Sequence, residues 1–114
     1  MKNMVTVGVS SLEDTKARLA AAFQGEPQGN RISFLSIEQM WKTLGPKRAE
    51  VIRAMTGQGV LSIREVARRV GRDVKAVHGD VTALIKAGVI DRQDRGVVFP
   101  YDGVHIDFVL GKAA

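Results

Sequence analysis

Five residues between positions 75 and 86 have side chains and a spacing that suit contact with a nucleic acid. At about 100° per residue, they form one stripe along a helix that we expect over residues 74–87. The stripe consists of Lys75, His78, Gly79, Thr82 and Lys86. It offers hydrogen-bond donors and small side chains, and it holds no carboxylate because Asp80 falls outside it. An exposed helix face of this kind can enter the major groove of duplex DNA between the phosphates.

Two helices joined by a tight turn must position this stripe. The first should begin after Ser62, which has the residue type of an N-cap, with Glu65 at the reciprocal capping-box position. The turn is expected at residues 71–73, where Gly71 ends one helix and Asp73 caps the next. The second helix also has an apolar stripe, formed by Val74, Val77, Val81, Leu84 and Ile85. The pattern predicts a helix-turn-helix with helix 74–87 in the groove.

The formal net charge of +5 is concentrated around this pair of helices. Residues 42–95 carry twelve basic and six acidic side chains, whereas residues 1–41 carry four of each. Excess positive charge favours a polyanion partner through electrostatic steering and counterion release. The cations that we expect to contact phosphates are Arg64, Arg68, Arg69, Arg72 and Lys86. Arg68 and Arg69 could instead form only the solvated side of their helix.

Residues 1–30 are expected to form an N-terminal arm and linker outside the DNA-binding unit. Valines at positions 5, 7 and 9 alternate with small or polar residues, which predicts a short strand. A helix should follow over residues 11–23, and the polar segment 24–30 is the clearest linker. So small an arm must pack either on its own domain or on a second subunit. We favour the second subunit, which implies a homodimer.

Residues 31–114 are expected to form the DNA-binding domain. Two helices come before the helix-turn-helix. The first contains Trp41, which we place in the core, and the second covers residues 46–55. A last strand, over residues 104–110, should lie beside either the hairpin described next or the N-terminal strand.

A β-hairpin is predicted directly after helix 74–87, in the position of a wing. Residues 89–92 and 96–99 are rich in apolar residues and flank a polar turn. Arg92 and Arg95 lie on or near the tip, where they could contact phosphates or the minor groove. The predicted fold class is therefore α+β: a winged helix-turn-helix with an N-terminal strand-helix arm and a C-terminal hairpin wing.

Catalytic, metal-binding and membrane functions find no support in the sequence. The chain has no cysteine, which excludes disulfides and thiolate metal sites. His105 is isolated, and the aspartates at positions 91, 94, 102 and 107 follow no metal-ligand spacing. No nucleophile–base arrangement or glycine-rich phosphate loop stands out, and no apolar run approaches the ~20 residues of a membrane span. We expect a cytoplasmic protein that is not an enzyme and needs no cofactor or metal.

Residues 70–90 resemble the corresponding region of winged helix-turn-helix regulators of the ArsR and MarR-like kind. The landmarks are Val70, Gly71, Ala76, Val77, Val81, Leu84, Ala87, Gly88, Val89 and Ile90. The wider string is also similar to a smaller family of predicted transcriptional regulators, which resemble the antitoxin-type DNA-binding half of two-gene systems. Its marks are Phe34, Ser36, Trp41 and residues 46–48, 62–67, 72–74 and 100–102.

This resemblance, over residues 32–110, implies a homodimeric repressor that reads duplex DNA with helix 74–87. It places Lys75, His78 and Thr82 at positions that face bases or groove phosphates. Gly79 departs from the pattern, because a long polar or basic side chain often stands there. Either the backbone approaches DNA closely at this point, or the protein is a weakly specific binder.

Two alternatives remain open. One is an antitoxin that binds a cognate toxin protein and also its own promoter. The other is a winged-helix protein-interaction module without DNA binding. The basic stripe free of carboxylates argues against the second alternative, since protein interfaces more often expose aromatic side chains.

Overall fold

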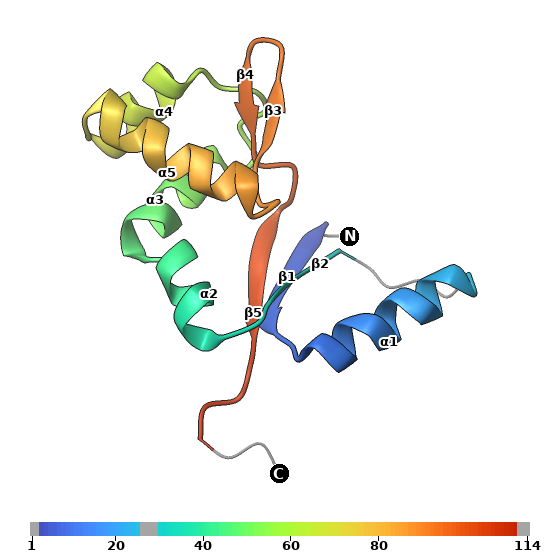
Figure 1. The fold of residues 1–114 in the computed structure, drawn as a ribbon. Coiled ribbons are helices and arrows are strands. Elements are labelled where there is room, and N and C mark those ends of the chain that lie inside the picture. The colour runs from blue at the N-terminus through green and yellow to red at the C-terminus, as the bar shows by residue number, and fades with distance from the viewer. Residues whose placement is uncertain (1–2, 26–29, 112–114) are drawn as a thin grey trace.

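The computed structural model describes residues 3–25 and 30–111. These residues form five helices and two small sheets, an α+β architecture. Figure 1 shows two halves: helices α2–α5 with a β-hairpin, and a three-stranded sheet with α1 extending from its other side. In this part of the chain no helix is both long and apolar enough to cross a membrane.

The larger sheet joins the two ends of the chain. Its middle strand, β1 (Met4–Val9), pairs in parallel with β2 (Arg31–Phe34) and with β5 (Gly103–Asp107). Val7 is buried and shares a core with Phe34 and the helices. The strand of the expected N-terminal arm therefore packs on its own chain, beside the last strand. Alternation predicted both strands, and of the two neighbours expected for the last strand, the N-terminal strand is the one observed.

Helix α1 (Leu12–Phe23) connects β1 to β2 and buries none of its side chains. The expected cap is present: Ser11 Oγ accepts a hydrogen bond from the Asp14 N–H, and the Asp14 carboxylate accepts one from the Ser11 N–H. The apolar edge of the helix is exposed, and Phe23 keeps 85% of its accessible surface. Its neighbours Leu12 and Leu19 are exposed as well.

Four helices enclose the main core. They are α2 (Ile37–Thr43), α3 (Pro46–Met55), α4 (Ile63–Val70) and α5 (Val74–Lys86). Met40, Val51, Val66 and Leu84 are fully buried, one from each helix. The expectation that Trp41 lies in the core is wrong. Its side chain is 46% exposed and packs edge-on against Phe108, with ring centroids 5.5 Å apart, because Met40 takes the inward position of α2.

The hairpin after α5 consists of β3 (Asp91–Gln93) and β4 (Gly96–Val98). It begins later than predicted, because the N–H groups of Val89 and Ile90 donate to the Leu84 carbonyl and close the end of α5. Leu61, just before α4, pairs with Val97 as a third strand position. Gly96 permits this contact, since a Cβ there would lie 2.2 Å from the Leu61 carbonyl oxygen.

Candidate nucleic-acid interface

The turn between α4 and α5 sets the start of the helix that carries the predicted stripe. Gly71 adopts the left-handed conformation (φ 69°) that ends α4 and that glycine tolerates best. The Asp73 carboxylate then accepts hydrogen bonds from the N–H groups of Lys75 and Ala76, at 3.0 and 3.3 Å. The predicted turn and both of its caps are confirmed. The first turn of α5 is therefore fixed by the Asp73 side chain.

The face of α5 predicted from the sequence is exposed over most of its length. Lys75, His78, Gly79 and Lys86 all lie at the surface. A Cβ added to Gly79 would meet no atom within 4 Å, so nothing inside the described part of the molecule requires glycine at this position. Val74, expected in the buried stripe, is exposed, and the buried stripe starts at Val77.

Thr82 does not belong to the exposed face. Its side chain is half-buried, and its Oγ1 is buried without a hydrogen-bond partner among the described residues. Because this hydroxyl is covered, the expectation that Thr82 lies on the exposed stripe is wrong. Helical periodicity assigned it an angle but could not show that neighbouring elements cover that side of the helix. The exposed, carboxylate-free face is consequently limited to Lys75, Ala76, His78, Gly79 and Lys86.

Asp80 binds α5 to the two elements behind it. Its Oδ1 accepts a hydrogen bond from Arg48 Nε of α3 at 3.1 Å, and its Oδ2 accepts one from Arg72 Nη1 of the turn at 2.7 Å. Burial alone would raise the pKa of this carboxyl, but the hydrogen bonds from Arg72 and Arg48 outweigh it and lower the pKa. Arg48 Nη1 also donates to the carbonyls of Lys42 and Thr43 at the end of α2.

This arrangement corrects the expectation for Arg72. Its side chain is only 20% exposed and is paired with Asp80, so it orients α5 and is not available to bind a phosphate as expected. The position of Asp80 outside the polar stripe was the sequence signal for such a partner, but the identity of the two arginines depends on the folded arrangement.

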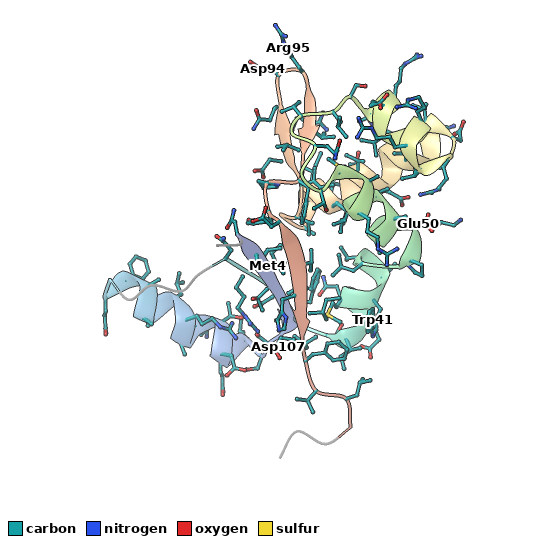
Figure 2. All side chains as sticks on the ribbon, turned by 180° about the vertical axis from the view of Figure 1, so that it is seen from behind. Met4, Trp41, Glu50, Asp94, Arg95 and Asp107 are labelled. Carbon is teal, nitrogen blue, oxygen red and sulfur yellow. The ribbon has the colours of Figure 1, made fainter. Side chains whose placement is uncertain are left out.

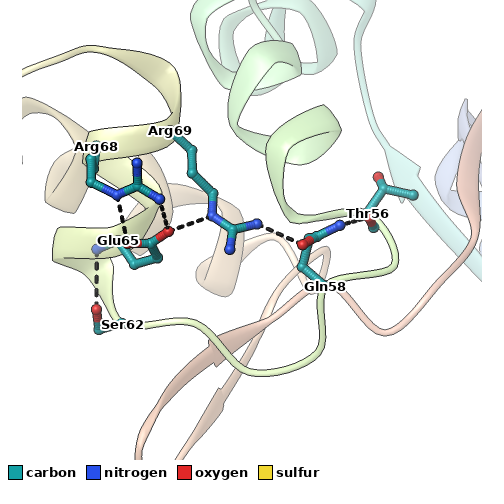
Figure 3. A network of polar contacts seen from close by, with 6 residues as sticks. All are labelled: Thr56, Gln58, Ser62, Glu65, Arg68 and Arg69. Carbon is teal, nitrogen blue, oxygen red and sulfur yellow. Dashed lines mark hydrogen bonds and ion pairs between the residues drawn. The ribbon is translucent and has the colours of Figure 1, made fainter.

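Glu65 holds both arginines of α4 that were expected to contact phosphates (Figure 3). Its carboxylate accepts hydrogen bonds from Arg68 Nε at 2.8 Å and from Arg69 Nε at 2.6 Å. Arg69 Nη1 also donates to Gln58 Oε1 at 2.6 Å. The hydrogen bonds from Arg68 and Arg69 lower the Glu65 pKa to about 2.

The cluster of Glu65, Arg68 and Arg69 therefore carries a net charge of +1, and its two cations are not free as the sequence suggested. It also explains why the second half of the predicted capping box is absent. Ser62 Oγ accepts from the Glu65 N–H, but the Glu65 carboxylate is engaged by the arginines. Arg68 keeps 70% side-chain exposure, so it can still face a phosphate without leaving Glu65.

The hairpin carries two exposed cations at the same end of the molecule as α4 and α5 (Figure 1). Arg92 lies on β3, and Arg95 lies in the turn, where it points away from the body beside Asp94 (Figure 2). Both positions agree with the prediction from the sequence. Arg64, on α4, is also exposed. On α4, α5 and the hairpin, the exposed cations that form no ion pair among the described residues are Arg64, Lys75, Lys86, Arg92 and Arg95.

No three histidine, cysteine or acidic side chains lie together as a possible metal site within residues 3–25 and 30–111. The surface of α4, α5 and the hairpin offers hydrogen-bond donors and positive charge.

Comparison with known proteins gives one match. The model of the HVO_A0114 family matches residues 43–106, from the end of α2 through most of β5. No curated protein and no solved structure matches the chain significantly. The matched segment contains the whole α3–α5 unit and the hairpin, and it exceeds half of the 114 residues. The chain therefore belongs to the HVO_A0114 family.

Proposed function

We propose that this protein is a winged helix-turn-helix regulator of transcription that binds duplex DNA with α5 in the major groove. The observation that carries the proposal is the exposed face of α5 at Lys75, His78 and Gly79, which lies directly after a capped turn and contains no carboxylate. In helix-turn-helix proteins, the N-terminal residues of the second helix contact the base edges. The one acidic side chain in the middle of α5, Asp80, faces Arg48 and Arg72.

The arrangement around α5 supports the wing part of the proposal. The hairpin follows α5 directly, and Leu61 adds a third strand position to it through hydrogen bonds with Val97 of 2.8 and 2.9 Å. The hairpin is thus joined to the chain that follows α5 and hydrogen-bonded to the chain that precedes α4. Arg92 and Arg95 therefore have a defined position relative to α5. A hairpin held in this way can bring its cations to the phosphates or minor groove beside the groove that the helix occupies.

We expect phosphate contacts to supply most of the affinity. Only Lys75 and His78 offer side-chain donors on the exposed first half of α5, so direct readout of bases should be limited. Besides Lys75, four exposed cations lie on α4, α5 and the hairpin, and Arg68 adds a partly neutralised one. Because phosphate contacts fix position but carry no sequence information, discrimination between operators should be modest.

The regulator should act as a homodimer that occupies a promoter in the cytoplasm. Helix α1 exposes Leu12, Leu19 and Phe23, and a 12-residue helix without tertiary packing is marginal in water. Its two acidic and two basic side chains cancel, so two copies can approach without net repulsion. Burial of this edge against a second copy would join two α5 helices in one dimer. Light scattering on the purified protein tests this: a monomer at micromolar concentration would contradict it.

Fluorescence anisotropy with a duplex from upstream of the protein's own gene tests DNA binding. We expect log K to fall with log salt with a slope of roughly −4.5 per subunit, given five exposed cations and about 0.9 per phosphate contact. Lys75→Ala should reduce discrimination between this duplex and an unrelated one. Lys42→Ala, a matched loss of one exposed charge on α2, should leave both affinities unchanged. No binding even at low salt would refute the proposal.

A second function is favoured by the exposed apolar residues far from α5. Phe23, Val109 and Leu110 lie at the surface, on α1 and beyond β5. The protein could be an antitoxin that binds a toxin protein there and its own promoter through α5. Co-expression with the product of the adjacent gene distinguishes this from simple repression: co-purification supports the antitoxin, and a clean single protein from the intact operon contradicts it. If the protein neither binds DNA nor self-associates, the remaining alternative is a protein-interaction module without DNA binding.

A further inference from the structure

Four polar side chains meet on the face of the large sheet that is turned away from α2. Ser10 follows β1, Arg31 and Ser33 belong to β2, and Arg18 reaches over from α1. Ser10 is only 4% exposed, and both arginines are half-buried. This group, which we call the Ser–Arg cluster, lies at the end of the molecule opposite the hairpin (Figure 1) and plays no part in the proposed DNA contact.

The two guanidinium groups converge on two hydroxyl oxygens. Arg18 Nη2 donates to Ser10 Oγ at 2.9 Å, and Arg18 Nη1 donates to Ser33 Oγ at 3.4 Å. Arg31 Nε donates to Ser33 Oγ at 3.3 Å, and Arg31 Nη2 donates to Ser10 Oγ at 3.4 Å. Ser10 Oγ also donates to Ser33 Oγ at 3.4 Å.

The Ser–Arg cluster has more donors than acceptors. Ser33 Oγ receives three donated contacts, although a hydroxyl oxygen has only two lone pairs. Most of these contacts are long, which is typical of donors that share too few acceptors. Within residues 3–25 and 30–111, no carboxylate oxygen lies within 4 Å of either guanidinium. Among the described residues, two positive charges are therefore held together by neutral oxygens only.

Gly8 makes room for this arrangement. A Cβ at Gly8 would lie 2.6 Å from Arg31 Nη2, so the guanidinium of Arg31 occupies the space that a side chain would fill. The neighbouring charged groups do not neutralise the cluster. Asp14 caps α1 by accepting from the Ser11 N–H. Asp107 pairs with Gly8 across the sheet, but its carboxylate makes no ion pair with Arg31 in the described part of the chain.

We propose that Ser10, Arg18, Arg31 and Ser33 bind a small oxyanion, either a phosphate or a carboxylate. The planar fork of a guanidinium matches both groups, and charged acceptors form stronger hydrogen bonds than hydroxyls do. The anion would accept from both arginines and both serine hydroxyls, which removes the shortage of acceptors. Because Arg18 belongs to α1 and no side chain of α1 is buried, the anion would also tie α1 to the sheet.

Titration of the ¹⁵N-labelled protein with sodium phosphate, with sodium citrate and with sodium chloride of equal ionic strength tests the proposal. We expect saturable amide shifts at residues 10, 18, 31 and 33 with phosphate, with citrate or with both, and the two arms tell which oxyanion fits. Sodium chloride should not produce them. Amide hydrogen exchange in α1 should slow when the site is filled.

Arg31→Gln should weaken the saturating anion at least about tenfold, because it removes two charged donors. Lys16→Gln removes the same charge from the outer part of α1 and should leave the affinity unchanged. If Arg31→Gln does not fold, Ser33→Ala replaces it and should weaken binding while leaving the guanidinium groups in place. Equal affinity in the Arg31 and Lys16 variants would overturn the proposal. The same holds for no saturation below about 10 mM, a weak limit for a specific small-ligand site. Neither result depends on whether the protein binds DNA.

Discussion

Replacing Asp80 with asparagine should loosen α5 from the helices behind it. Asp80 accepts from Arg48 and Arg72 at 3.1 and 2.7 Å, and these bonds link α3, the turn and α5. Asparagine has nearly the same shape and helix propensity. It removes the negative charge, however, and it turns an amide NH₂ toward a guanidinium that can only donate. One of the two arginines therefore loses its acceptor.

The size of the effect follows from the burial of the three groups. Exposed ion pairs contribute about 0–1 kcal/mol, and removing one partner of a fully buried pair costs about 3–5 kcal/mol. The Asp80 side chain is 15% exposed, and those of Arg48 and Arg72 are 26% and 20% exposed. The pair lies between the two limits, so we expect a loss of about 2 kcal/mol in the free energy of unfolding. This corresponds to roughly 8 °C in Tm for a chain of this length.

Urea denaturation of the wild type, Asp80→Asn and Glu50→Gln measures this difference. Glu50 is exposed on the same bundle, and its substitution removes one negative charge without a partner in the described structure. Glu50→Gln should therefore stay within about 0.5 kcal/mol of the wild type. If Asp80→Asn were no less stable than Glu50→Gln, the interpretation of Asp80 as the link between α5 and its neighbours would be refuted.

The difference in stability between the wild type and Asp80→Asn should depend on pH. The hydrogen bonds from Arg72 and Arg48 keep the pKa of Asp80 below its ordinary value in the folded protein. A depressed pKa gives stability that is complete above the unfolded pKa of about 3.9 and is lost as the pH falls through the folded pKa. The difference between the wild type and Asp80→Asn should therefore be constant between pH 5 and 7 and shrink below about pH 4. A difference that grew on acidification would contradict the sign.

Three further substitutions separate the roles of α4 and α5. Gly79→Ala should raise the free energy of unfolding by about 1 kcal/mol, because alanine has the better helix propensity and its Cβ would meet no other atom. The same substitution should weaken duplex binding if the backbone lies close to DNA. Denaturation and anisotropy measure the two effects, and unchanged affinity would exclude close approach. Thr82→Val removes a buried hydroxyl without a partner among the described residues, so the free energy of unfolding should be unchanged or higher by up to about 1 kcal/mol. Discrimination between DNA sequences should stay the same. Lower discrimination would show that Thr82 contacts the DNA. Glu65→Gln should release Arg68 and Arg69 and steepen the salt slope by about 1, whereas an unchanged slope would show that neither reaches a phosphate.

Local patterns predicted the elements that position the interface. Residue types with strong conformational preferences mark their ends: Pro46 starts α3, Gly71 ends α4 and Asp73 caps α5, as expected. Such signals act within one turn of the chain, so a sequence can reveal them without knowledge of the fold. For the same reason the expected bounds of α3 and α5 agree with the structure to within one residue.

Partners distant in the sequence were harder to predict. The parallel pairing of β1 with β5 joins residues about a hundred positions apart, and alternation in each strand cannot identify the neighbour. Among the cations, Arg72 was expected to be free because it lies in the turn, eight residues before its partner Asp80 in the middle of α5. The Glu65 pairs lie within one turn and could have been foreseen, since carboxylates three and four residues before arginines form ion pairs on a helix.

Helical periodicity also has a limit at the boundaries of a face. It distinguishes the inward from the outward side of a helix but does not show how far neighbouring elements extend around it. Thr82 and Val74 were misplaced for this reason, in opposite directions: one is covered and the other is exposed. Trp41 was misplaced because its spacing put it on the same stripe as Met40 and Leu44, but only those two are buried.

The most direct test of the central claim is an NMR titration of the ¹⁵N-labelled protein with duplex DNA. We expect the largest amide shifts at Lys75, His78 and Gly79 on α5 and at Arg92 and Arg95 on the hairpin, with α1 unaffected. These shifts should weaken steeply with added salt. Shifts confined to α1 and the large sheet, or none at low salt, would contradict the conclusion that α5 and the hairpin form a DNA-binding surface.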